Sequence, residues 1–390
     1  MKLLYIYAII LICFYIYYIF TYTNICENFI NTPMPIRLPS FETITKRVQW
    51  NANYGYCGET SFIDALLYYG GYMSQYNMRA LAISLMDDDV QQSDKGGQLL
   101  IDGNIDMKVA SALGLKSISY TGKNTDEFIK WINTNIKMPV IIGVYMNSDM
   151  LECEDCDNCD ADPDYDHIVP VISVDYNVNI PIKQDNMKKI TICDNGLYTD
   201  DKNNPYYMCP NITPMTRKDA LCNNSTIYAI PKVVMPTKKF KTRLTNTLKN
   251  YGIAITGLLD SNSIPIRIIS VPNIETPEMV DGSNDQPDSN IVSLTLYLSK
   301  LIRNKKYDLY KCTNMFNIPT NISQTISNKK DNILIQTITA TSDTMIINTI
   351  KSKDAQGNII NKPITIKSSD TAIFRCYPQD KQNLLKQKSR

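Results

Sequence analysis

The chain has 390 residues, of which 44% are hydrophobic and 20% are charged, and these values are those of a folded protein and not a disordered one. Its 40 basic and 39 acidic residues leave a formal net charge of +1, so the composition does not suggest a nucleic-acid partner held by a broad basic surface. This length is sufficient for two domains.

The first segment of the chain predicts a membrane anchor. Residues Leu3–Phe20 are uncharged and almost wholly apolar, a length just sufficient to span a bilayer. Lys2 precedes them and the following Thr21–Thr23 make a poor cleavage site, so we expect an uncleaved signal anchor over residues 1–23, with a cleaved signal peptide as the alternative. Positive charge on the N-terminal flank predicts a single-pass membrane protein with a lumenal or extracellular C-terminal region, or a secreted protein.

Export affects the interpretation of the eleven cysteines, because thiols pair in an oxidising compartment. We expect Cys209 and Cys222 to close a small loop, and Cys312 and Cys376 to join within the C-terminal part. One cysteine lies in the apolar segment and Cys57 is assigned below as a free thiol. An odd number remains, so at least one more is expected to be free or paired between chains.

A stalk is predicted over residues 24–47, where prolines are scattered among polar residues without a sustained period. A folded domain is then expected over residues 48–232. Pro231–Asn250 carries two prolines and a run of basic residues and marks its end, with residues 233–250 as a solvated linker. A membrane-surface role for these basic residues is the alternative.

A cysteine is predicted at the N-terminal end of a buried helix. Asn53 and Gly55 suit a tight bend, and Cys57 follows with Gly58. Apolar residues then recur at helical spacing up to a glycine pair that ends the helix: Phe62, Ile63, Ala65, Leu66, Leu67 and Tyr69. The free backbone N–H groups and positive dipole end of such a helix favour thiolate over thiol at Cys57.

Further helices and a strand follow this first helix. Helical patterns cover residues 77–89, 104–115 and Thr125–Ile136, the last with Thr125 or Asn124 as its cap. Pro139–Met146 is a short apolar run that predicts a buried strand. Helices followed by strands indicate an α+β domain.

The sequence contains one histidine, His167, which is the only imidazole that can serve as a base for Cys57. It opens an apolar run, Ile168–Val174, that predicts a mostly buried strand. A second short strand is predicted to end at Asp194 and Asn195, where either side chain can orient an imidazole. The chain order is cysteine on a helix, histidine on a strand, and Asp or Asn after the next strand.

The segment Glu152–Asp166 is rich in cysteines and carboxylates. Its cysteines recur at the spacing of a metal site, but a fourth ligand is missing and disulfides within an insertion are the favoured alternative. Its aspartates at 160, 162 and 164 resemble the start of a calcium loop but lack the glycine and closing glutamate, so no more than a weak surface calcium site is expected. We expect this acidic loop to rim the cleft and to favour basic substrates.

The ordered set of motifs resembles the papain-like cysteine peptidases, most closely the compact branch that includes the bacteriocin-leader (double-glycine) peptidases. The motifs are Tyr56–Ser61 (YCGETS), Asp166–Val171 (DHIVPV) and Cys193–Gly196 (CDNG), and the resemblance covers roughly residues 45–230. Family members place a glutamine that stabilises the oxyanion about six residues before the cysteine. In this chain Asn51 occupies that place, and Gln49 lies two residues earlier.

The resemblance implies a thiol hydrolase that cleaves a peptide or isopeptide bond in a peptide or protein substrate. Cys57 would be the nucleophile, His167 the base and Asp194 its orienter, with Asn195 as the alternative orienter and Asn51 or Gln49 as the side-chain oxyanion donor. Glu59 would complement the helix dipole without acting as a catalytic acid. No cofactor or metal is expected. The alternatives are a transglutaminase or acyltransferase using the same thioester chemistry, and an inactive papain-like scaffold in a membrane-anchored binding or adhesion protein.

The C-terminal part predicts an all-β domain over residues 251–378. Short β runs alternate with turn residues, as in a β-sandwich of the immunoglobulin or fibronectin type. The runs cover residues 251–259, 265–271, 291–299, 307–312, 332–339, 344–350, 361–368 and 371–377. Sequons at Asn223, Asn224 and Asn321 are compatible with a glycosylated surface. The polar tail 379–390 is expected to be frayed.

Overall fold

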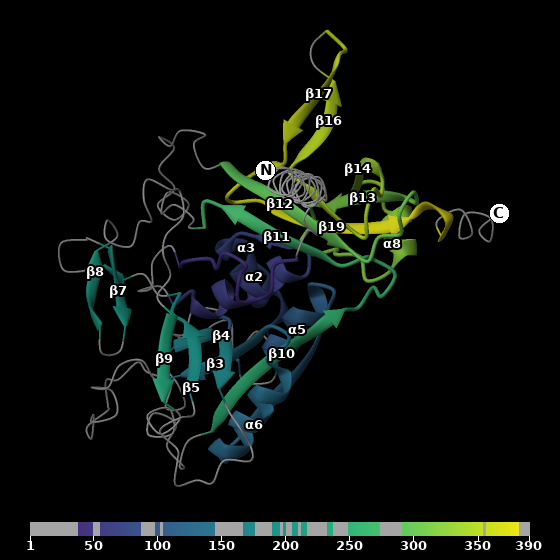
Figure 1. The fold of residues 1–390 in the computed structure, drawn as a ribbon. Coiled ribbons are helices and arrows are strands. Elements are labelled where there is room, and N and C mark those ends of the chain that lie inside the picture. The colour runs from purple at the N-terminus through teal and green to yellow at the C-terminus, as the bar shows by residue number, and fades with distance from the viewer. Residues whose placement is uncertain are drawn as a thin grey trace, which may run out of the picture. The chain divides into compact units, whose positions relative to one another are not determined.

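A computed structural model describes a mixed α+β chain with several antiparallel sheets, as the sequence predicts (Figure 1). It describes residues 38–49, 55–86, 98–101, 104–144, 167–175, 189–195, 198–199, 205–209, 212–216, 232–236, 249–273, 291–353 and 356–381. No helix in these ranges is both long and apolar enough to cross a bilayer. The predicted anchor lies outside them.

A six-stranded antiparallel sheet carries the elements expected of the first domain. Its order is β2 (Leu115–Gly122), β10 (Asn250–Leu258), β3 (Val140–Val144), β4 (His167–Asp175), β5 (Lys189–Cys193) and β9 (Lys232–Pro236). Strand β10 lies in the sheet interior, where Ile253 pairs with Ser119 of β2 and with Ile141 of β3. The strand that opens the predicted second domain is therefore part of the sheet of the first.

Two four-stranded sheets form the β-rich part of the chain. One has the order β1 (Gly71–Met73), β19 (Thr371–Pro378), β13 (Lys306–Cys312) and β14 (Asn332–Thr339). The other has the order β11 (Ile266–Val271), β12 (Ile291–Ser299) and β15 (Thr344–Ile347), and β18 (Thr365–Lys367) also pairs with β12. Each β run predicted between residues 251 and 377 contains a strand.

The prediction of two separate domains is wrong, because the two parts of the chain share one hydrophobic core. Strand β1 belongs to the predicted peptidase domain, yet it pairs with β19 near the end of the chain. Apolar residues of both four-stranded sheets, of β10 and of helix α2 (Cys57–Tyr68) form one hydrophobic cluster. The prediction of a linker over residues 233–250 fails at both of its ends, because β9 pairs with β5 as far as Pro236 and β10 begins at the buried Asn250.

Helix α2 lies at the centre of this arrangement. All residues from Gly58 to Leu67 are buried, as expected for a helix covered on all sides. It packs against β4 of the six-stranded sheet and against β1 and β11 of the two smaller sheets (Figure 1). Burial on every side fixes the position of its first residue, Cys57.

Three other helices follow the predicted patterns. Helix α3 (Gln75–Leu85) begins two residues earlier than predicted because the Ser74 side chain accepts a hydrogen bond from Asn77 N at 3.0 Å. Helix α5 (Ile105–Ala112) precedes Gly114, which has a φ of 72°. Helix α6 (Thr125–Asn135) is capped by Asn124. A short helix, α8 (Ile322–Ser327), is capped by the exposed sequon residue Asn321.

Two small sheets complete the described structure. Strands β16 (Thr349–Lys353) and β17 (Ile359–Pro363) form a hairpin that stands away from the sheets in Figure 1. Strands β6 (Tyr198–Thr199), β7 (Pro205–Cys209) and β8 (Ile212–Thr216) form a three-stranded sheet.

The predicted stalk is wrong from Leu38 onward. Phe41, Ile44 and Val48 are buried, and Ile44 belongs to the main apolar cluster. The guanidinium of Arg47 is also buried and donates to Ser270 Oγ and Pro272 O at 3.4 and 2.5 Å. This segment therefore packs onto the folded part because its apolar residues and one arginine find partners there.

The predicted disulfide between Cys312 and Cys376 is not formed. Both cysteines are free and buried. They lie on neighbouring strands, but Cys312 pairs with Ile373 and Cys376 pairs with Leu309. Three residues of offset place their Cα atoms roughly 10 Å apart along the strands, which is beyond disulfide reach. The predicted pair of Cys209 and Cys222 includes a residue outside the described ranges.

Candidate active site

His167 and Asp194 meet at one edge of the six-stranded sheet. His167 begins β4, and Asp194 directly follows β5, its antiparallel neighbour. The start of one strand and the end of the other therefore lie together, and His167 Nε2 is 3.1 Å from Asp194 Oδ1. Both side chains are buried. The structure thus places Asp194 as the partner of the imidazole.

Cys57 reaches the same imidazole from helix α2. It is the first residue of the helix, is free and is half-buried. The start of α2 is held to β4 by Ser61 Oγ, which donates to Ile168 O at 3.2 Å. Because His167 Nε2 faces Asp194, Nδ1 is the ring nitrogen left to exchange a proton with the Cys57 sulfur. The structure therefore brings Cys57, His167 and Asp194 together.

The surroundings of His167 favour its protonated form. Burial of the ring lowers the pKa of His167, but hydrogen bonds to Asp194 and Cys57, together with their charges, outweigh this and raise it to about 10. A raised pKa favours the imidazolium form at neutral pH. An imidazolium beside a cysteine sulfur stabilises a thiolate, the form that acts as a nucleophile.

Asn195 has a different place from the one predicted for an alternative orienter. Its Nδ2 donates to Ser61 Oγ at 2.9 Å and to Cys57 O at 3.3 Å. Its Oδ1 accepts a hydrogen bond from Gln49 Nε2 at 3.1 Å, and its backbone oxygen accepts from Gln49 N at 2.9 Å. Asn195 therefore connects the start of α2 to the chain segment before it.

The same contacts correct the prediction for Gln49. Its side chain is buried, and its amide nitrogen is directed at Asn195, so it serves as a structural link and not as an oxyanion donor. Asn51, the other predicted donor, lies outside the described residues. Among the described residues, the backbone N–H of Cys57 at the helix start is a donor that could serve an oxyanion.

A buried ion pair supports the turn before Cys57, and no motif or periodicity in the sequence predicts it. Glu59 Oε1 accepts from Arg79 Nε at 2.8 Å and from Leu99 N at 3.0 Å. Arg79 also donates to Gly55 O at 2.7 Å and stacks on the Tyr56 ring at 3.6 Å. Glu59 is therefore an anchor for the turn, consistent with its exclusion as a catalytic acid.

Gly58 is required by a close backbone approach. A Cβ at this position would lie 1.9 Å from the carbonyl oxygen of Leu99. The backbone of residues 98–101 thus crosses the start of α2 so closely that a side chain at position 58 would not fit. This contact explains why a glycine follows the cysteine in the motif.

Asp64 gives a prediction about the pH dependence of stability. This carboxyl is fully buried in α2, where Oδ1 accepts from Arg47 N at 2.7 Å. Burial raises the pKa of Asp64 to about 7, against the lowering effects of Lys46 and Arg47. Because the folded-state pKa exceeds 3.8, the ordinary value for an aspartate, the contribution of Asp64 to stability is present below pH 3.8 and is lost as the pH rises to about 7.

We therefore expect Asp64→Asn to remove part of this pH dependence. Between pH 4.5 and 7.5, the free energy of unfolding in urea should fall more for the wild type than for the variant. Parallel curves for the two proteins would contradict a raised pKa at Asp64.

Other predicted site features find no support among the described residues. The cysteine-rich acidic loop lies outside them. Within the described ranges, no group of three or more His, Cys, Asp or Glu side chains is arranged to hold a metal ion.

Comparison with known proteins gave no significant match, whether to protein-family models, to curated proteins or to solved structures. The geometry of Cys57, His167 and Asp194 is therefore the basis on which a function can be inferred for this chain.

Proposed function

We propose that the chain is a cysteine peptidase of the papain-like type, and the meeting of Cys57, His167 and Asp194 supports this proposal most strongly. Two of these residues come from strand ends at one sheet edge, and the third begins the helix packed against that edge. The imidazole has one nitrogen toward a carboxylate and the other available to sulfur. This is the arrangement that a thiol nucleophile requires.

The reaction proceeds through a thioester. Cys57 thiolate attacks the carbonyl carbon of a peptide or isopeptide bond, and the backbone N–H of Cys57 stabilises the oxyanion, a contribution of about 3 kcal/mol per donor. His167 imidazolium gives its proton to the leaving amine, and the C–N bond breaks. The neutral imidazole then takes a proton from water, which hydrolyses the thioester and restores the thiolate–imidazolium pair. Asp194 holds the ring orientation throughout.

The setting of this reaction follows from the sequence. With an anchor at residues 3–20, the folded part would act on peptide or protein substrates in the lumen or outside the cell. An amine in place of water in the second step would make the enzyme a transferase. Product analysis with an added primary amine separates hydrolysis from transfer.

Covalent labelling tests the proposal. An epoxide or vinyl-sulfone probe should label the wild type at Cys57 and should not label Cys57→Ala. Cys312→Ala is the matched control, because it removes a free, buried cysteine from β13 and should retain labelling. Equal, low labelling of wild type and Cys57→Ala would instead favour an inactive scaffold with a binding role.

The pH dependence of turnover tests the environment of His167. Because the pKa of His167 is raised to about 10, kcat/KM should keep its upper plateau well above pH 6.5 and fall only as the pH approaches 10. The same shift contributes stability that is present below pH 6.5 and is lost as the pH rises to about 10. A descending limb near pH 6.5 would contradict an imidazolium paired with Cys57 and Asp194.

A further inference from the structure

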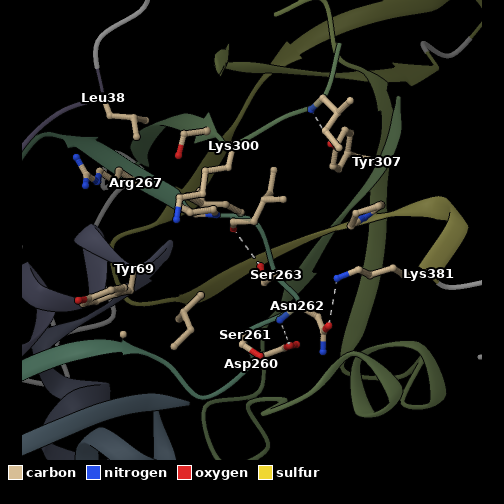
Figure 2. A pocket seen from close by; sticks show the side chains of 18 of the residues that line it. Leu38, Tyr69, Asp260, Ser261, Asn262, Ser263, Arg267, Lys300, Tyr307 and Lys381 are labelled. Carbon is tan, nitrogen blue, oxygen red and sulfur yellow. Dashed lines mark hydrogen bonds between the residues drawn. The ribbon is translucent and has the colours of Figure 1, made fainter. Parts of the chain in front are cut away.

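A cavity of about 620 Å³ lies at the opposite end of α2 from Cys57 (Figure 2). Tyr68, the last residue of the helix, and Tyr69 line it, together with segments from the ends of β10, β12 and β19. Eleven residue steps of a helix place Tyr68 about 16 Å from Cys57, so the cavity is separate from the proposed active site. Its volume is within the range of small-molecule sites.

Four cationic side chains line this cavity: Arg267, Lys300, Lys305 and Lys381. Among the described residues, only Lys305 has a carboxylate partner. Arg267 donates to Pro39 O and to Tyr68 Oη, the latter at 2.7 Å, and its guanidinium lies 4.2 Å from the centre of the Tyr68 ring. Lys300 makes no hydrogen bond or ion pair within the described part of the chain.

The other charged side chains at the cavity make polar contacts within the described residues. Lys305 Nζ lies 2.7 Å from Asp380 Oδ2, and Lys381 Nζ donates to Asn262 Oδ1 at 3.4 Å. The lining carboxylate, Asp260, is buried and accepts hydrogen bonds from Asn262 N at 2.9 Å and Tyr377 Oη at 2.7 Å. Both of its oxygens are therefore engaged, so Arg267, Lys300 and Lys381 have no carboxylate partner within the part of the chain that the structure describes.

Apolar side chains form much of the remaining wall. They include Leu38, Leu258, Ile264, Ile266 and Ile302. Ile302 is 59% exposed although it borders a hollow, so its apolar surface is open to a ligand. The cavity therefore has cationic side chains that can bind an anionic group and an apolar wall that can contact a hydrocarbon chain.

The backbone at Lys300 supports a role for its side chain. Lys300 has a φ of 57°, a left-handed conformation in which glycine or asparagine is the usual residue. A lysine in this conformation raises the free energy of the folded chain, and glycine or asparagine would adopt the same backbone conformation at a lower cost. Residues in such conformations are concentrated at ligand-binding and functional sites.

We infer that this cavity binds an amphipathic organic anion, a carboxylate or phosphate group carried on an apolar chain. Arg267 and Lys300 hold the anionic group by charge-assisted hydrogen bonds, and the apolar wall contacts the chain. The ligand does not involve Cys57, so this inference stands independently of the proposed peptidase activity.

Calorimetric titration of the full chain with decyl phosphate, below its micelle concentration, tests the inference. Wild-type protein should bind the probe, and Lys300→Asn should weaken binding by about tenfold, because it removes a charged hydrogen bond while suiting the left-handed backbone. The matched control is Lys351→Asn, which removes one exposed lysine on β16 and should leave binding unchanged. Cys57→Ala should also bind normally, which separates this result from the peptidase test.

Two comparison ligands decide which part of the probe is recognised. Inorganic phosphate should bind at least tenfold more weakly than decyl phosphate, and so should decyl maltoside, which keeps the chain without the charge. Equal binding of either ligand overturns the inference, because the site would then recognise an anion alone or an apolar chain alone. Equal loss in Lys300→Asn and Lys351→Asn would also overturn it, since general surface charge would then explain the affinity.

Discussion

Replacing His167 with alanine should lower kcat/KM for peptide hydrolysis by about 10⁴-fold or more. The imidazole is the only one in the chain, so no second histidine can take over either proton transfer. Its loss leaves Cys57 without an imidazolium partner and the leaving amine without a proton donor. Initial rates on a fluorogenic peptide measure the loss of turnover, and the labelling assay measures the loss of Cys57 reactivity.

The fold should survive this change, which makes the result interpretable. His167 opens β4, and that strand remains paired with β3 through Ile168 to Val171. A melting temperature within a few degrees of the wild type is therefore expected for His167→Ala. Activity within tenfold of the wild type, in a folded variant, would contradict a catalytic role for the histidine.

Replacing Gly58 with alanine should have the second largest effect, on stability and activity together. The new methyl group would lie 1.9 Å from the Leu99 carbonyl oxygen. Neither group can rotate away, because the oxygen belongs to the backbone and the methyl group is attached directly to it. Helix α2 cannot retreat because it is buried on all sides. We expect a loss of about 3 kcal/mol or more in the free energy of unfolding, measured in urea, and a matching loss of Cys57 labelling.

Gly257→Ala is the matched control for this substitution. Gly257 lies in β10, and a Cβ there would meet no atom within 4 Å. The same methyl addition should therefore change the free energy of unfolding by less than about 0.5 kcal/mol. If the two variants unfold at the same urea concentration, the approach of residue 99 to the start of α2 is not the constraint that we describe.

Local pattern predicted the parts of the site that depend on one element each. Apolar spacing after Cys57 located α2, and the apolar runs after His167 and before Asp194 located β4 and β5. Antiparallel pairing then brings a strand start and a strand end together without further information. The chain order of the three residues, together with its resemblance to the papain-like peptidases, therefore predicted their meeting.

Local sequence patterns could not predict contacts between segments that are distant in the sequence. The ion pair of Glu59 with Arg79 and the approach of Leu99 to Gly58 join residues whose spacing carries no periodic signal. Strand register decided against the disulfide of Cys312 and Cys376, and register depends on turns and on burial across the whole sheet. The domain boundary failed for a related reason, because β runs do not show which sheet each strand joins.

The pairing of β1 with β19 makes the setting of α2 depend on segments that are distant in the sequence. Gly71, just after the helix, pairs with Ile373, and β10 pairs with β3 through Gly252 and Ile142. A ribosome makes Cys57, His167 and Asp194 before it makes either β10 or β19. In the peptidase that we propose, the nucleophile would therefore gain its rigid setting only after these later strands have been made.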